Sequence, residues 1–184
     1  LFGGRYPTPL DRDSFQLPPS DRHPLGTDRS GFDILTILVY GSRVSLLVGF
    51  ASSAVAMLLG TSMGLVRGYY GRQVDQLLSR VTDFFLVIPW LPFVIIIAAI
   101  LGRGLSTTII AISLVSWPTT TRIVRSQVLS IKERLFIERA RAIGSGNGHI
   151  LRRHILPNVM PLVFANASLT VSSAIFTEAF LSFF

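Results

Sequence analysis

The chain has 184 residues, of which 49% are hydrophobic and only 15% are charged. Soluble domains carry about 25% charged residues, so this composition favours a membrane protein. Cysteine is absent, which excludes disulfide frameworks and thiol chemistry, and the formal net charge of +7 admits nucleic acid, acidic lipid or an acidic protein as a partner. The placement of the basic residues has to decide among these partners.

The N-terminal part of the chain is predicted to be a loop. Residues 1–30 are rich in Pro, Asp and Arg, which is typical of irregular structure. From residue 30 onward apolar residues recur at helical spacing, so we expect a short interfacial helix before the first membrane span. We therefore predict two regions: an extracytoplasmic loop with its helix over residues 1–43, and a transmembrane domain over residues 44–184.

Four later stretches contain no Asp, Glu, Lys or Arg: Val44–Val66, Phe84–Gly102, Gly104–Thr121 and Ile155–Thr177. A helix needs about 20 apolar residues to cross the hydrocarbon core of a bilayer. One central charge would cost about 2.5–3.5 kcal/mol on the insertion scale. We therefore predict an all-α membrane protein with four spans in this chain. The alternative is a soluble protein with four buried helices, but so short a chain offers little to cover them.

Three residues within the spans are candidates for lining a transport path. Pro89 and Pro92 must kink or break the second span, and such breaks survive in lipid only where protein or water satisfies the freed carbonyls. An ordinary Pro kink is the alternative for both. Asn166 in the fourth span needs hydrogen-bonding partners, so it should face another helix or a wet cavity.

The basic residues predict the orientation of the chain. Residues 67–83 contain three Arg, and residues 122–154 contain eight Arg or Lys. Residues 1–43 contain five Arg balanced by five Asp. Because cytoplasmic loops carry the excess of basic residues, we expect 67–83 and 122–154 in the cytoplasm and 1–43 and the turn at Arg103 outside. This distribution argues against nucleic acid, and a start outside the membrane indicates an earlier span in a longer protein.

The long basic segment between the third and fourth spans has a helical pattern on each side of a break. We expect one helix over Ser126–Ile143, an interruption at residues 144–148, and a second helix over 148–156. Asn147 is expected to cap the second helix, and Pro157 to end it. Two interpretations stay open: a basic loop lying on anionic lipid, or a rigid bent element that docks onto a cytoplasmic partner.

Enzymatic chemistry has little support in the sequence. A phosphate-binding P-loop needs Gly-Lys-Ser/Thr, but the only lysine, Lys132, lies between Ile131 and Glu133. The three histidines are scattered, and no spacing supports a Ser/His/Asp set or a metal site. No charge lies inside the spans before Glu178, which argues against an ion-gradient-driven transporter. We expect neither catalytic nor metal-ligating residues.

Several motifs carry a family resemblance. Residues 138–157 fit the pattern E-A-A, three residues, G, nine residues, I-x-L-P, with Arg139 replacing the middle Ala and His154 in the Ile place. This segment resembles the EAA loop of bacterial ABC importer permeases. HPLGTDRSGFDIL at residues 23–35, YGSRVSL at 40–46 and GYYGRQVDQLLSRVTD at 68–83 resemble the dipeptide/oligopeptide/nickel permease subfamily, from which Phe32 departs. The likeness extends over residues 23–184.

The resemblance implies the C-type permease subunit of a peptide importer, with the type I ABC importer fold and four of its six spans in this chain. Such a subunit lies in the bacterial inner membrane and forms the translocation path with a sister permease. Two cytoplasmic ATPase subunits would bind ATP and Mg, and an extracytoplasmic binding protein would deliver the peptide. The chain itself would be non-catalytic and would bind no cofactor.

The resemblance also gives the segment 122–157 a role in coupling to the ATPases. The implied coupling residues are Glu138, Ala140, Arg141, Gly144, Leu156 and Pro157. Glu138 would pair with a basic residue of the partner or cap backbone amides, Gly144 would allow the bend, and Leu156-Pro157 would fix the return into the membrane. A nickel or metal-chelate importer is the alternative cargo class, and an ion-gradient-driven transporter is the alternative mechanism.

Overall fold

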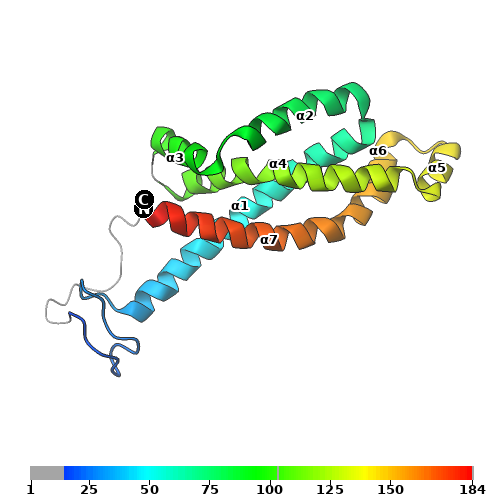
Figure 1. The fold of residues 1–184 in the computed structure, drawn as a ribbon. Coiled ribbons are helices and arrows are strands. Elements are labelled where there is room, and N and C mark those ends of the chain that lie inside the picture. The colour runs from blue at the N-terminus through cyan, green and yellow to red at the C-terminus, as the bar shows by residue number, and fades with distance from the viewer. Residues whose placement is uncertain (1–14, 103, 184) are drawn as a thin grey trace. The chain divides into compact units, whose positions relative to one another are not determined.

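The computed structural model describes residues 15–102 and 104–183. Residues 1–14 of the predicted loop and Arg103 of the predicted outer turn lie outside these ranges. The chain divides into two compact units, Leu1–Leu47 and Val48–Phe184. The described residues are helical apart from short connections and the loop before residue 34, where Thr27 and Asp33 form an isolated antiparallel bridge. The all-α prediction is confirmed (Figure 1).

In the first unit the loop before the first helix is braced by hydrogen bonds rather than by a core. The Leu17 amide donates to Thr27 Oγ1 at 2.9 Å, and the Thr27 amide donates to the Leu17 carbonyl at 3.1 Å. Helix α1, Ile34–Tyr70, starts immediately after Asp33. The residues expected to form a separate interfacial helix are therefore the first turns of α1.

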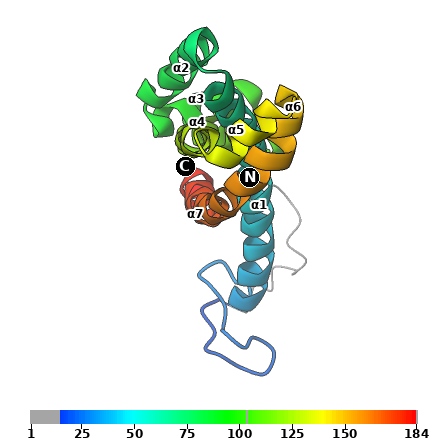
Figure 2. The ribbon, with the colours of Figure 1, turned by 90° about the vertical axis from the view of Figure 1, so that its right-hand side faces the viewer.

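In the second unit α4, Leu105–Lys132, is the central helix. It packs against α2 (Arg72–Val87), α3 (Trp90–Leu101) and α7 (Leu156–Phe183), as Figures 1 and 2 show. The α1 glycines at positions 60, 64 and 68 face α4 at four-residue spacing. A Cβ added to any of them would lie within 2.5–2.7 Å of an α4 side chain. Small residues at this spacing let two helix backbones approach closely, which membrane helices use in place of apolar burial.

The second predicted span is not one straight helix. Helix α2 ends at Val87, α3 begins at Trp90, and the two are bent by 90°. Pro89 lies at the break and accounts for it, because proline has no N–H to donate to the preceding turn. Pro92 lies in the first turn of α3, where the helix continues through it. The predicted break is confirmed, and it falls at Pro89 rather than at Pro92.

The number of spans is only partly confirmed. Two helical stretches are long and apolar enough to cross a membrane, Ile34–Tyr70 and Asn147–Ser182, and a third is counted if the bent pair α2–α3 is one span. Helix α4 has 28 residues and contains the predicted third span, but it is not among them. Its Ser and Thr side chains dilute the apolar residues, which lowers its mean hydropathy.

The segment between α4 and α7 differs from the expected pair of helices. The structure has α5 at Leu135–Ala142, α6 at Asn147–His149 and a π-helical turn, η1, at Ile150–Ile155. The expectation of one helix over Ser126–Ile143 is wrong, because α4 ends at Lys132 and a turn precedes α5. The expectation that Pro157 ends a helix is also wrong. Pro157 lies in the first turn of α7, where the preceding π-helical turn changes the hydrogen-bond register and accommodates its missing N–H.

Candidate functional site

The segment between α4 and α7, residues 133–155, is held to the helix bundle by apolar side chains. Ile137 and Ala140 of α5 and Ile150 and Ile155 of η1 are at most 5% exposed. They join one buried cluster with residues of α1, α4 and α7, among them Tyr69, Val128, Ile131 and Val159. Well-packed interiors transmit displacement rather than absorb it. The segment is therefore a bent element attached rigidly to the bundle.

Its outer surface combines exposed apolar and basic side chains. Ile143 is 84% exposed and Leu135 is 69% exposed, and Arg139 and Arg141 lie beside them in an exposed stretch. Within α5 Ala140 is buried, whereas Ile143 lies in the open, since α5 ends at Ala142. Large exposed apolar side chains with a polar rim are typical of a surface that binds a partner.

The six predicted coupling residues fall into two groups. Ala140 is buried and Leu156 is half-buried, so both contribute to attachment. Glu138, Arg141, Gly144 and Pro157 are exposed. Gly144 has φ +84°, and its amide donates to the Arg141 carbonyl at 2.9 Å, while the Ser145 amide donates to the Ala140 carbonyl at 3.0 Å. These bonds close the end of α5 and turn the chain, which confirms the bend expected at Gly144.

Asn147 does not cap the helix that follows it. The residue before α6 is Gly146, and the Asn147 side-chain oxygen instead accepts a hydrogen bond from the Tyr69 hydroxyl at 2.7 Å. In the π-helical turn, where residues five apart share a face, the His149 and His154 rings lie 5.6 Å apart between centroids. Within the described residues, no group of three or more His, Cys, Asp or Glu is arranged to hold a metal ion.

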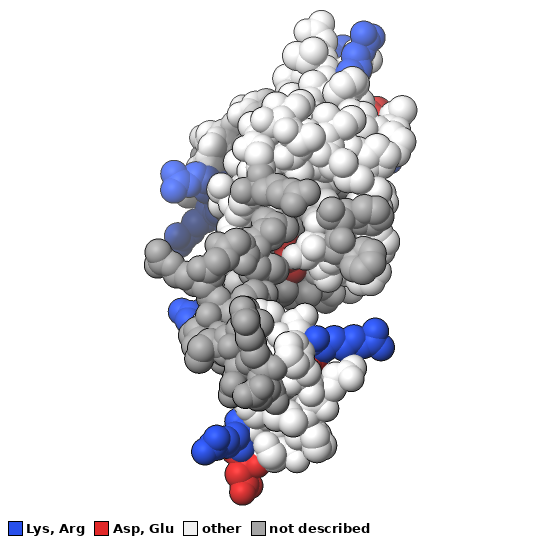
Figure 3. Space-filling view, turned by 90° about the vertical axis from the view of Figure 1, so that its left-hand side faces the viewer, with Lys and Arg blue, Asp and Glu red and all other residues white. Residues whose placement is uncertain are grey.

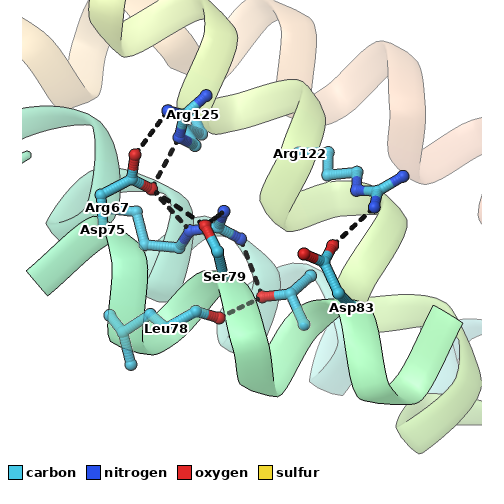
Figure 4. Close-up of polar contacts among 8 residues, drawn as sticks. Arg67, Asp75, Leu78, Ser79, Asp83, Arg122 and Arg125 are labelled. Carbon is cyan, nitrogen blue, oxygen red and sulfur yellow. Dashed lines mark hydrogen bonds and ion pairs between the residues drawn. The ribbon is translucent and has the colours of Figure 1, made fainter.

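A charged cluster joins α1, α2 and α4, and sequence analysis did not predict it. Arg67 is 4% exposed and donates to Asp75 Oδ1 at 3.1 Å, to Thr82 Oγ1 at 2.8 Å and to Ser79 Oγ at 2.6 Å (Figure 4). Arg125 of α4 contacts both carboxylate oxygens of Asp75, with Nε 2.8 Å from Oδ1. A buried charge of this kind is stable only with a paired partner. The cluster fixes α2 against both α1 and α4.

The sequence held one signal for this cluster. Arg67 and Asp75 are eight residues apart across the short turn at Gly71, and Arg125 belongs to the segment predicted on the same side of the membrane. The positive-inside count used both arginines only to predict the side of the membrane. A second ion pair, Arg122 Nη2 to Asp83 Oδ1 at 2.6 Å, lies on the surface, where such pairs contribute little to stability.

Asn166 lines a groove of about 740 Å³ between α4 and α7, together with hydroxyl-bearing residues of both helices: Ser116, Thr119, Thr170, Ser172, Ser173 and Thr177. Its amide nitrogen donates to Thr120 Oγ1 at 3.1 Å, so Asn166 faces another helix as expected. Trp90, between the two prolines of the α2–α3 break, also lines the groove, whereas Pro89 and Pro92 are not among its lining residues. The groove mixes these polar groups with apolar side chains such as Leu169 and Phe176, and no described residue that lines it is charged.

A larger groove of about 990 Å³ lies between α1 and α7. Its lining is dominated by apolar side chains, among them Phe50, Leu58, Leu65, Met160 and Phe164. Hydrocarbon or another apolar helix suits such a surface better than a polar solute does. The hydroxyl-lined groove is therefore the better candidate for contact with a hydrophilic cargo.

On the face shown in Figure 3, the surface of the described residues is largely uncharged. In the space-filling view of Figure 3 most of the described surface is white, and the Lys and Arg side chains lie at separate places rather than in one patch. Binding of a nucleic-acid backbone needs a continuous basic stripe. On the face shown, the part of the chain that the structure describes has none.

Apolar helices of membrane length, a groove that mixes hydroxyl and apolar side chains and a rigidly attached bent segment are typical of a helical membrane protein. The chain belongs to the family described as the binding-protein-dependent transport system inner membrane component, whose model matches residues 56–184. The fold agrees with this assignment. A chain of the inward-facing MetNI methionine ABC transporter superposes with a TM-score of 0.69 at 23% identity, over 79% of this chain and 73% of that chain.

Related sequences narrow the likeness further. The dipeptide transport system permease protein DppC of Alkalihalophilus pseudofirmus is 46% identical over 165 residues, which cover 90% of this chain and 54% of the relative. The oligopeptide transport system permease protein OppC of Bacillus subtilis is 37% identical over 166 residues, again 90% of this chain and 54% of the relative. The chain thus spans about half the length of the curated relatives it matches. The resemblance to this permease subfamily is confirmed.

Proposed function

We propose that this chain is part of the transmembrane permease subunit of an ATP-driven ABC importer for peptides. The carrying observation is the bent segment of residues 133–155, whose inner face is buried in the bundle while Leu135, Ile143 and the neighbouring arginines stay exposed. A partner that moved this surface would move α4 and α7 with it. The names of the related permeases support dipeptides or oligopeptides as cargo.

The partner on this surface would be a cytoplasmic ABC ATPase subunit. The chain has no P-loop, so ATP and Mg would bind to the ATPases, and this subunit would be non-catalytic. Exposed Glu138 and Arg141 would contact the ATPase, Ala140 and Leu156 would anchor the segment, and Gly144 and Pro157 would set its shape. A sister permease would complete the path, and an extracytoplasmic binding protein would deliver the peptide.

The path would run along the hydroxyl-lined groove beside Asn166. A lining that carries hydroxyl and amide groups among apolar side chains, and no charge, can hydrogen-bond peptide groups without binding one charge type tightly, as a passage for varied peptides requires. Pro89 and Pro92 would act through the α2–α3 break, which places Trp90 at the groove. The subunit would lie in the bacterial inner membrane with residues 67–83 and 122–154 in the cytoplasm and residues 1–43 outside.

The test is purification of the full-length protein with its partners, in wild-type form and with Glu138→Lys. The wild-type protein is expected to co-purify with an ATPase subunit and a second permease, and to drive ATP-dependent peptide uptake in vesicles. Charge reversal at exposed Glu138 should reduce ATPase recovery about 5- to 30-fold, the effect of losing one or two kcal/mol at a contact. Glu133→Lys, in the turn before α5, is the matched control.

Three results would contradict the proposal. Unchanged ATPase recovery with Glu138→Lys would remove Glu138 from the contact. Uptake that needs an ion gradient and no ATP would replace the mechanism by a secondary transporter. Uptake of nickel or a metal chelate in place of peptides would leave the mechanism intact and change the cargo class.

A further inference from the structure

Tyr69 in the last turn of α1 contacts both sides of the bend in the segment 133–155. It is 6% exposed. Its hydroxyl donates to Asn147 Oδ1 at 2.7 Å, beyond the bend, and the Arg141 guanidinium lies 5.7 Å from the centre of its ring, before the bend. A cation over an aromatic face and a directed hydrogen bond fix different degrees of freedom. Tyr69 was not among the residues that the sequence singled out, and Asn147 was expected only as a helix cap.

The bend has few other restraints close to it. A Cβ built on Gly144, Gly146 or Gly148 would meet nothing within 4 Å, so the backbone of the bend lies in open space. The buried contacts of Ala140 and Ile150 lie on either side of it. The Tyr69 hydroxyl therefore supplies a polar anchor for the part of the segment between these two packed ends.

Tyr69 also belongs to a turn that holds two other elements. Gly68 packs against Val128 of α4, where an added Cβ would lie 2.6 Å from the Val128 Cβ. Arg67 bonds to Asp75, Ser79 and Thr82 of α2. Three consecutive residues thus connect α4, α2 and the bent segment, and a displacement of the bend has a direct route into the end of α1.

We propose that Tyr69 is a positioning residue for ATPase coupling: through its hydroxyl on Asn147 and its ring under Arg141, it sets the orientation of the bend relative to α1. The inference rests on the proposed function, because it assumes that residues 133–155 receive the ATPase stroke. Without the hydroxyl, residues 133–155 stay attached through their apolar side chains, but the bend loses its fixed orientation. Part of each ATPase movement then shifts only the bend and does not reach the helix bundle.

The experiment uses the full-length permease assembled with its sister permease, ATPases and binding protein in proteoliposomes. The quantity measured is the amount of peptide transported per ATP hydrolysed. Tyr69→Phe is expected to lower this ratio about 2- to 10-fold, the range that corresponds to one hydrogen bond. Tyr70→Phe is the matched control, because Tyr70 is the adjacent tyrosine and is 50% exposed. It should keep the wild-type ratio.

Variants at the acceptor complete the design. Asn147→Asp keeps an oxygen acceptor for Tyr69 and should retain most of the ratio, whereas Asn147→Leu should match Tyr69→Phe. The double variant Tyr69→Phe with Asn147→Leu should lose no more than either single change, as two halves of one interaction require. Equal ratios for Tyr69→Phe and Tyr70→Phe, or additive losses in the double variant, would overturn the inference.

A second readout separates this inference from the proposed function. A spin label at Ser145→Cys reports the mobility of the bend and needs no transport. Mobility should rise with Tyr69→Phe and stay at the wild-type level with Tyr70→Phe; no rise with Tyr69→Phe would sink the positioning role. A rise in mobility in a complex whose wild type shows no ATP-driven uptake would uphold the contact and refute the proposed function instead.

Discussion

At the scale of single residues, the bend in residues 133–155 depends on backbone conformation more than on side-chain contact. Gly144 has φ +84° with open space around its Cα, so no neighbour forbids a side chain there. The left-handed conformation alone favours glycine. Gly146, two residues later, has φ −69° and ψ 156°, which any residue adopts. The two glycines therefore provide a matched pair for testing the bend.

Gly144→Val is expected to strain the bend by about 1–3 kcal/mol and to reduce peptide uptake several-fold, while membrane insertion persists. Gly146→Val should leave uptake near the wild-type level, because valine accepts the extended conformation. Uptake and membrane-inserted protein are measured in the same cells. Equal uptake by the two variants would mean that the bend at Gly144 plays no part in coupling.

The Asp33 carboxylate makes the stability of the start of α1 depend on pH. Its carboxylate accepts hydrogen bonds from the Thr36 hydroxyl at 2.7 Å and the Thr36 amide at 2.8 Å, and it lies 3.1 Å from His23 Nδ1. The hydrogen bonds from Thr36, followed by the contact with His23, hold the pKa of Asp33 below its ordinary value of 3.8. The carboxylate therefore stabilises the start of α1 above pH 3.8, and this contribution is lost as the pH falls through the lowered pKa.

Asp33→Asn is accordingly expected to speed amide exchange in the first turn of α1 about 2- to 5-fold at neutral pH, because asparagine keeps an acceptor for Thr36 but loses the negative charge at the helix N-terminus. The difference from the wild type should shrink as the pH falls through the lowered pKa of Asp33, because the wild-type carboxyl then becomes neutral as well. Hydrogen exchange of residues 34–38, measured across pH and corrected for intrinsic rates, checks this. A difference that persists undiminished at the lowest pH would assign the effect to shape rather than charge.

At the scale of elements, the seam between α1 and α4 shows how much the sequence could predict. The uncharged runs located α1 and α7 correctly, since freedom from charge over about 20 residues is a local property. The four-residue spacing of Gly60, Gly64 and Gly68 was also in the sequence, but only the structure shows that α4 is the helix it faces. The spacing of the glycines shows which face of a helix they occupy, but which other helix packs against that face depends on the whole fold.

Gly64→Ala is expected to lower the stability of the bundle by about 1–3 kcal/mol, because the added Cβ would lie 2.7 Å from the Val124 Cβ and 2.9 Å from the Thr121 carbonyl oxygen. Gly41→Ala is the control, since a Cβ at that position meets nothing within 4 Å. Thermal unfolding of the purified full-length protein in detergent gives both values. A Gly64→Ala protein as stable as Gly41→Ala would show that the seam can open without loss.

One misjudged feature and one missed feature share a physical cause. Pro157 was judged by the local rule that proline ends helices, and the pairing of Arg67 and Arg125 with Asp75 was not predicted at all. Both depend on structural context that the local sequence pattern does not give. The π-helical turn accommodates the missing N–H of Pro157, and the paired Asp75 carboxylate makes burial of Arg67 tolerable. The bend at Gly144 was predictable because the steric cost of a left-handed backbone needs no distant partner.

At the scale of the whole molecule, the charge distribution predicts on which side of the membrane each segment lies. The excess of Arg and Lys in segments 67–83 and 122–154 predicts that both lie on one side of the membrane and that residues 1–43 lie on the other. The charged cluster of Arg67, Asp75 and Arg125 supports a common side for the first two, because its members come from both segments.

Single-cysteine labelling tests the topology directly, because this chain has no native cysteine. Ser145→Cys is expected to react with a membrane-impermeant maleimide only after the membrane is opened, and Ser20→Cys to react in intact spheroplasts. Any cysteine elsewhere in the full-length protein is first replaced. Labelling of both positions from outside would refute the predicted orientation and remove the ATPase from the proposed surface.

The π-helical turn at Ile150–Ile155 has one more consequence, for the rotational phase of α7. Successive residues of an α-helix are offset by about 100° around its axis, so the extra residue in each turn of η1 decides which azimuth every later side chain occupies. The hydroxyls that α7 contributes to the groove, and the Asn166 amide, thus owe their direction to six residues that lie outside it. Deleting one of those six residues would rotate the polar side chains of α7 away from the groove and towards lipid, although no residue that lines the groove would have changed.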